Sequence, residues 1–158
     1  MRPVPFALCL ALCLAVAAPR PVTAQLSDTK ILALDATKAA LAAAEAEARR
    51  NGWAVSIAVV DAHGELLGFS RMDGASLLSI EISQRKAATS ARGKRPSKEY
   101  ADRITQGNLA TLALDVMPLE GGVPIVVNGL VVGGIGVSGV TSAQDAQCSA
   151  AGAAAVKP

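Results

Sequence analysis

Two apolar runs on either side of Asn128-Gly129 constrain the fold of this chain most strongly. Residues 123–127 and 130–137 are rich in valine and isoleucine, which are typical of β-strands. An Asn-Gly pair between two such runs is the strongest two-residue signal for a hairpin, because both central positions of a type I′ turn need a positive φ. The sequence therefore predicts an antiparallel pair of strands over residues 123–137.

A second hairpin is predicted upstream, over residues 53–71. Val55, Ile57 and Val59 alternate with smaller residues, so one face of this strand is better filled than the other. The Asp-Ala-His-Gly segment at 61–64 has the composition of a turn, and residues 65–71 would form the returning strand. Two hairpins favour an antiparallel sheet, because parallel strands need long crossover connections.

A long helix is predicted before the first hairpin, from Ser27 to Arg50. Ser27 is a suitable N-cap, and Leu26 and Ile31 could form a hydrophobic staple across the first turn. The apolar face would carry a seven-residue repeat of Leu34, Leu41 and Ala48. Asn51-Gly52 would end the helix, because glycine adopts the left-handed cap without strain.

Further helices are predicted over residues 77–92, 97–104 and 141–156. Ser76 could cap the first of them, and Thr141 with Gln144 fits a capping box at the start of the last. Residues 106–119 carry no clear pattern. The order is helix, hairpin, helix, irregular segment, hairpin, helix, which predicts an α+β fold with helices covering an antiparallel sheet.

The first 24 residues have the order of a secretory signal peptide. Arg2 supplies the positive start, Phe6 to Ala18 is an apolar run, and Val22-Thr23-Ala24 offers small residues at the cleavage site. The run is shorter than the roughly 20 apolar residues that span a bilayer. We expect cleavage before Gln25, a periplasmic or secreted product without a membrane anchor, and one domain over residues 25–158.

Removal of that segment would leave a chain of balanced charge. Of the 15 basic residues, Arg2 and Arg20 would be lost, which leaves 13 against 13 acidic residues. The remaining aromatic residues would be Trp53, Phe69 and Tyr100. We expect no nucleic-acid binding, because such a chain lacks a cationic surface and stacking platforms. The remaining cysteine, Cys148, cannot form an internal disulfide. It could pair with a second chain, but we expect it to pack as a small apolar group.

The supply of reactive side chains argues against several kinds of catalysis. One histidine, His63, and one cysteine cannot build a dedicated zinc site. A Ser-His-Asp triad, or acid–base catalysis by imidazole, would have to use His63 in a predicted turn where nothing orients it. We therefore predict no catalytic residue, and no metal apart from the iron of a haem.

The run Gly134-Ile135-Gly136-Val137-Ser138-Gly139 matches the pattern G-x-G-x-x-G. Dinucleotide binding is disfavoured, because it needs a βαβ unit and an acidic residue about 20 positions further on, and the chain ends too early. An anion could instead bind at the start of the last helix, where glycines admit close approach and free amides point outward. Asp145 could equally satisfy these amides within a simple capped turn. The candidate anion-binding residues are Gly136, Ser138, Gly139 and Thr141.

Four residues are candidates for holding haem. His63 and Met72 could each be an axial ligand of the iron. The alternatives are a solvent-exposed turn residue, which its context favours for His63, and a packing role for Met72. Arg71 and Lys86 could bind propionate carboxylates. The alternatives are a local Arg71–Asp73 ion pair and a solvent-exposed helix face for Lys86.

Short motifs follow one another in a fixed order from about Leu26 to the end. They are Val59-Val60-Asp61 with Gly64, Arg71-Met72-Asp73-Gly74-Ala75, Lys86-Ala87, Arg95-Pro96-Ser97, Gly121-Gly122-Val123-Pro124-Ile125, the run from Gly133 to Gly139, Asp145 and Gly152. This ordered set resembles the GlcG/HbpS family, which is also known from the C-terminal domain of PduO-type proteins.

The resemblance implies a profilin-like domain with three α/β/α layers and assembly into a homo-oligomer. It also implies haem as a cofactor, because some exported members bind haem, and haem- or iron-linked degradation has been attributed to the family. No fixed histidine of the family motif corresponds to His63. The motif residues would set turns or line a groove or subunit contact; they include Asp73, Gly74, Gly121, Gly122, Pro124 and Asp145.

Three functional hypotheses follow. The first is an exported haem-binding protein that acts as a carrier or sensor accessory rather than as a high-turnover enzyme. The second is a small enzyme, or an enzyme accessory, that binds a small anionic metabolite. The third is an oligomeric interaction module without a small ligand. The scarcity of aromatic residues argues against an enclosed haem pocket, although an aliphatic pocket between subunits would escape this objection.

Overall fold

The computed structural model describes residues 29–158. The predicted signal peptide, its cleavage site, the proposed N-cap Ser27 and the staple residue Leu26 lie outside this range. Within residues 29–158, every helix is too short or too polar to traverse a lipid bilayer.

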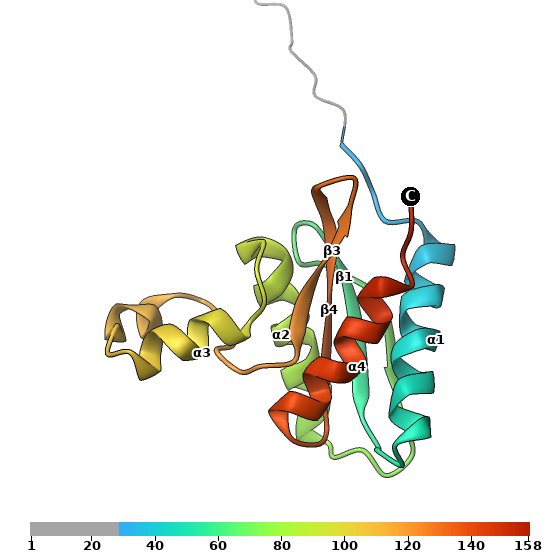
Figure 1. Ribbon diagram of the computed structural model, residues 1–158, viewed down its shortest axis with the longest axis horizontal. Helices are drawn as coiled ribbons and strands as arrows, with labels where there is room; N and C mark the ends of the chain where they lie inside the picture. The colour runs from blue at the N-terminus through green and yellow to red at the C-terminus, as the bar shows by residue number, and fades with distance from the viewer. Residues whose placement is uncertain (1–28) are drawn as a thin grey trace, which may run out of the picture.

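A four-stranded antiparallel sheet with the order β2-β1-β4-β3 forms the centre of the fold (Figure 1). The strands are β1 (Ser56–Asp61), β2 (Leu66–Arg71), β3 (Gly122–Val127) and β4 (Leu130–Ser138). Both predicted hairpins are confirmed, and Asn128 and Gly129 both have the positive φ that their turn requires. Pro124 lies on β3, an edge strand, where the lack of an N–H is tolerated.

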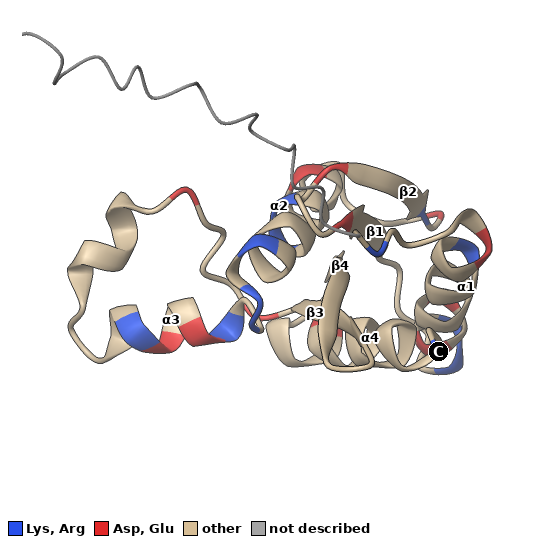
Figure 2. Cartoon of the chain, turned by 90° about the horizontal axis from the view of Figure 1, so that it is seen from above, with Lys and Arg blue, Asp and Glu red and all other residues tan. Residues whose placement is uncertain are grey.

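Helices cover both faces of the sheet, which confirms the expected α+β fold with three α/β/α layers (Figure 2). Helix α2 (Leu78–Gly93) packs on one face, and the antiparallel neighbours α1 (Leu34–Arg50) and α4 (Ser142–Ala154) pack on the other. The larger part of the apolar core lies between these two helices and the sheet; it includes Val55, Ile57 and Val59 of the predicted strand face.

Helix α1 begins seven residues later than the sequence pattern predicted, at Leu34 instead of Ser27. Residues 29–33 are not helical, and Leu32 among them is buried in the core. Ile31 and Leu34 are 77% and 62% exposed, so neither performs its predicted packing role. The buried face of α1 is instead made by small residues and one carboxylate: Thr37, Ala40, Ala44, Glu47 and Ala48.

Helix α2 lies unusually close to the sheet because the facing strand positions are glycines. A Cβ atom on Gly136 would lie 2.2 Å from the Ser83 carbonyl oxygen, and one on Gly122 would lie 2.3 Å from the Lys86 carbonyl oxygen. Gly122, Gly136 and Ala58 are neighbours across three adjacent strands, so they form one smooth row beneath the helix. The glycine run that resembles a nucleotide motif therefore serves helix–sheet packing.

Residues 97–119 form an extension beside the sheet, which we call the arm. It contains α3 (Lys98–Thr105) and the 3₁₀ helix η1 (Leu109–Ala113), and α3 packs mainly on η1 (Figure 1). The Ser97 hydroxyl donates to the Leu119 carbonyl (2.5 Å) and accepts from the Gly122 amide (2.9 Å), which ties both ends of the arm to β3.

We expect Gly136→Ala to lower the free energy of unfolding by more than about 2 kcal/mol, because the new methyl group collides with backbone that cannot move independently. Gly68→Ala is the matched control. Its Cβ would meet only side-chain atoms of Thr37 and Leu41, at 2.8 and 3.0 Å, and no backbone, so we expect a smaller loss. Urea unfolding followed by circular dichroism measures both; equal losses in the two variants would refute the packing argument.

Candidate functional site

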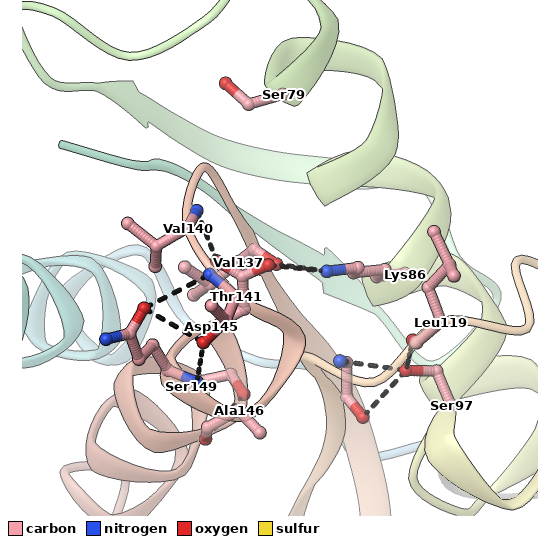
Figure 3. A network of polar contacts seen from close by, with 12 residues as sticks. Ser79, Lys86, Ser97, Leu119, Val137, Val140, Thr141, Asp145, Ala146 and Ser149 are labelled. Carbon is pink, nitrogen blue, oxygen red and sulfur yellow. Dashed lines mark hydrogen bonds and ion pairs between the residues drawn. The ribbon is translucent and has the colours of Figure 1, made fainter. Parts of the chain in front are cut away.

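The Lys86 ammonium group lies inside the protein and is 2% exposed. Its Nζ donates to Asp145 Oδ2 at 2.8 Å and to the Val137 carbonyl oxygen at 3.0 Å (Figure 3). Lys86 is therefore neither on a solvent-exposed helix face nor free to meet a propionate. It joins α2 to α4, two helices on opposite faces of the sheet.

Space for this ion pair is provided by Gly121, at the residue before β3. A Cβ there would lie 2.8 Å from Lys86 Nζ and 2.8 Å from the Asp145 Cβ, and the residue has a φ of +121° that favours glycine. Burial raises the pKa of the Asp145 carboxyl, while the hydrogen bond and charge of Lys86 and the Val140 amide act in the opposite direction.

The predicted anion site at the start of α4 is filled by the chain's own groups. The Thr141 hydroxyl accepts from the Gln144 amide, the Gln144 side chain accepts from the Thr141 amide, and Asp145 Oδ1 accepts from the Val140 amide at 3.2 Å. Ser138 is buried, and a Cβ on Gly139 would lie 2.5 Å from the Ala54 carbonyl oxygen. The capped turn is therefore the arrangement observed, and these residues form no open cradle.

The residues after β2 form a compact turn. The Arg71 guanidinium donates to the Ala75 carbonyl oxygen at 3.1–3.3 Å, so its local partner is this carbonyl and not Asp73. Met72 is partly buried and packs against the core, as the packing alternative predicted. Asp73 and Gly74 are exposed, and Gly74 has a φ of +85°.

His63 lies in the turn between β1 and β2 with an exposed side chain. Its amide donates to Asp61 Oδ1, and its carbonyl accepts from Arg92 Nε, both at 2.8 Å. Asp61 and Arg92 therefore hold the backbone of the turn in place, while the imidazole ring of His63 stays exposed. Met72 follows the other end of the six-residue strand β2, about 20 Å away, so the two residues of one chain cannot ligate the same iron.

A cleft of about 360 Å³ lies between α2, the β1–β2 turn and residues 115–117; we call it the α2 cleft. Arg85 and Arg92 contribute the positive charges. The other lining residues are Val60, Gly64, Glu65, Leu66, Gln84, Ala88, Thr89, Asp115, Val116 and Met117. Neither arginine was predicted as a site residue, although their seven-residue spacing places them on one face of the helix.

Other reactive groups in the described range do not form a centre. Residues 29–158 contain no cluster of three or more histidine, cysteine, aspartate or glutamate side chains that could hold a metal ion. Cys148 is buried, as expected, and desolvation together with the nearby Asp145 charge raises the pKa of its thiol from 9.0 to about 11.

We expect Lys86→Met to lower the free energy of unfolding by about 3–5 kcal/mol, because it leaves the Asp145 carboxylate buried without its cation. Adding Asp145→Leu to this variant should restore part of the loss, since the double variant has no uncompensated charge. Urea unfolding of the single and double variants measures the coupling; a double variant less stable than Lys86→Met would contradict this account.

Comparison with known proteins identifies relatives along nearly the whole described range. The model of a family described as "Haem degrading protein HbpS-like" matches residues 32–154. Protein GlcG of Escherichia coli K12 is 46% identical over 109 residues, which are 68% of this chain and 81% of GlcG.

Solved structures agree with this match. The crystal structure of a double mutant of Streptomyces reticuli HbpS superimposes with a TM-score of 0.76 at 37% identity, and covers 87% of this chain and 97% of the HbpS chain. The crystal structure of a PduOC:haem complex superimposes with a TM-score of 0.73 at 28% identity, and covers 80% of this chain and 96% of PduOC. The resemblance expected from the ordered motifs is confirmed, and the chain belongs to the GlcG/HbpS family.

Proposed function

We propose that this chain binds haem at its surface, beside the β1–β2 turn. The observation that carries the proposal is the exposed side chain of His63 in the β1–β2 turn. It borders a hollow of about 120 Å³ with Ile31 and Val132, while the next residue, Gly64, lines the α2 cleft. Two comparisons support the proposal. A structurally similar protein, PduOC, was solved as a haem complex, and the matching family is described as haem-degrading. Bound haem would supply an iron whose reactivity depends on its axial ligand and its exposure.

The dimensions of the cleft fit an exposed ligand better than an enclosed one. Its volume lies near the lower end of the range for small-molecule sites, so it would hold an edge of a macrocycle and leave the rest uncovered. This removes the objection that the chain has few aromatic residues, because no enclosed aromatic pocket is needed. His63 is the axial ligand that we favour, since Met72 is committed to core packing.

We further propose an exported carrier or sensor accessory. The signal-like order of the first 24 residues supports export. An open cleft, with Arg85 and Arg92 about half exposed, suits a ligand that is taken up and passed on.

A haem titration tests this proposal. The wild-type chain should shift the Soret band and saturate near one haem per chain, and His63→Ala should bind about tenfold more weakly or lose the shift. Met72→Leu keeps the core volume and is the matched control, so it should bind as the wild type does. Absence of saturable binding would refute haem binding, and normal binding by His63→Ala would refute the ligand assignment.

We also propose that the arm associates with a second copy of the chain. Four leucines of the arm are 41–64% exposed: Leu109, Leu112, Leu114 and Leu119. Large apolar side chains left exposed within one short segment are a feature of interaction sites. An eight-residue helix is too short to be stable alone, and α3 packs mainly on η1, so a contact outside its own chain would stabilise the arm.

Charge favours a copy of the same chain as the partner. Helix α3 carries two basic residues, Lys98 and Arg103, and two acidic residues, Glu99 and Asp102, so it is neutral and presents no strong field that would select a charged partner. In a two-fold symmetric dimer, the same surface of both subunits forms the contact, so the apolar side chains of one arm could pack on those of the other.

Light scattering after size exclusion tests the association. The wild-type chain at micromolar concentration should be dimeric or larger, and Leu109→Glu/Leu112→Glu should be monomeric because the glutamates would be buried in the contact. Leu34→Glu alters a leucine of equal exposure, 62%, on α1 and should leave the assembly intact. A monomeric wild type, or an unchanged double variant, would refute the arm contact.

A further inference from the structure

The α2 cleft presents two cationic groups on one wall. Arg85 and Arg92 are separated by seven residues, or about 10 Å along the helix axis, and both project from the same face of α2 into the cleft. The remaining wall of the cleft is mixed. Val60, Leu66 and Met117 give it an apolar part, and its polar groups come from Glu65, Gln84, Thr89 and Asp115. This combination is typical of sites that bind an organic anion, since the apolar part contacts carbon and the arginines bind the charge.

The terminal nitrogens of both arginines are only loosely paired within the chain, although Arg92 Nε is bonded to the His63 carbonyl. Arg85 Nη1 is 3.8 Å from Glu81 Oε1, and Arg92 Nη1 is 3.9 Å from Asp115 Oδ2. These distances describe charge contacts and not hydrogen bonds. By contrast, Lys98 and Asp102 on α3 are joined at 2.6 Å. The terminal N–H groups of the two arginines can therefore turn to a carboxylate at little cost to the fold.

The walls of the cleft are nevertheless held in place. The Met117 amide donates to the Thr89 hydroxyl at 2.8 Å, which fixes residues 115–117 against α2. Arg92 Nε donates to the His63 carbonyl, which fixes the β1–β2 turn against the same helix. A preformed site loses less conformational entropy when it binds its ligand.

The acidic residues of the cleft are accessible to solvent. Glu65 is exposed, and the Asp115 side chain is 90% exposed. An incoming carboxylate would displace them into water, where their charge is screened, and would meet no buried negative charge.

We propose that the α2 cleft is a carboxylate-binding site, in which Arg85 and Arg92 hold the acid groups of an organic ligand. The propionates of haem and a free small dicarboxylic acid share this chemistry. In the first case the inference rests on the proposed haem binding and specifies which residues hold the propionate edge; in the second it stands without haem.

A comparison of haemin with its dimethyl ester tests whether the cleft binds the propionate groups of haem. The ester has the same macrocycle and iron but no acid groups. The wild-type chain should bind haemin about tenfold to a hundredfold more tightly than the ester. Arg85→Ala/Arg92→Ala should bind haemin as weakly as the ester. Arg49→Ala removes a helix-surface arginine on the opposite face of the sheet and should keep the wild-type preference.

A second arm of the experiment measures glutarate binding to the same variants by calorimetry. If the wild-type chain binds glutarate only when both arginines are present, and binds neither haemin nor its ester, the carboxylate-binding site is supported and haem binding is refuted. An undiminished preference for haemin over its ester in Arg85→Ala/Arg92→Ala overturns the cleft assignment and leaves haem binding intact. Absence of binding to haemin, ester and glutarate by the wild-type chain overturns both proposals.

Discussion

The rest of the structure depends on the direct contact between the backbone of α2 and the glycines of β3 and β4. Only with glycine at positions such as Gly122 and Gly136 can the helix approach the strands at this distance. The approach brings the Lys86 side chain past Gly121 to Asp145, where its charge is neutralised inside the protein. Small residues on the helix, Ser83 and Ala87 among them, complete the same contact.

The position of α2 also determines the cleft on its outer flank. The side of the helix that faces the sheet is small and tightly packed, whereas the adjoining face carries Arg85 and Arg92. Thr89 and Arg92 then anchor the two loops that close the cleft. One helix thus provides structural contacts on one face and candidate binding groups on another, so a shift of α2 would disturb both.

Local sequence signals predicted the elements of the fold well, because hairpins and caps depend on residues close together in the chain. Asn128-Gly129 and the Thr141–Gln144 box are examples. The start of α1 was predicted wrongly: Leu32 is buried in a core that includes residues far along the chain, and residues 29–33 are not helical.

The candidate site also depends on contacts between residues that are far apart in the sequence. Nothing near Lys86 in the sequence reveals Asp145 as its partner, because the two residues are 59 positions apart. Arg85 and Arg92 were overlooked for a related reason: the groups that complete their cleft come from the β1–β2 turn and from residues 115–117, a segment without a recognisable pattern. The ordered motifs were more informative, because they reflect the whole fold.

Pro124 has a consequence for how copies of this chain can meet. It lies on an edge strand, and an edge strand can in principle recruit a strand from another molecule through its free N–H and C=O groups. A proline offers no N–H for such a ladder and its ring obstructs an approaching strand. Continuation of the sheet from one molecule into the next is therefore disfavoured on the β3 side, which leaves side-chain surfaces as the means of ordered assembly there.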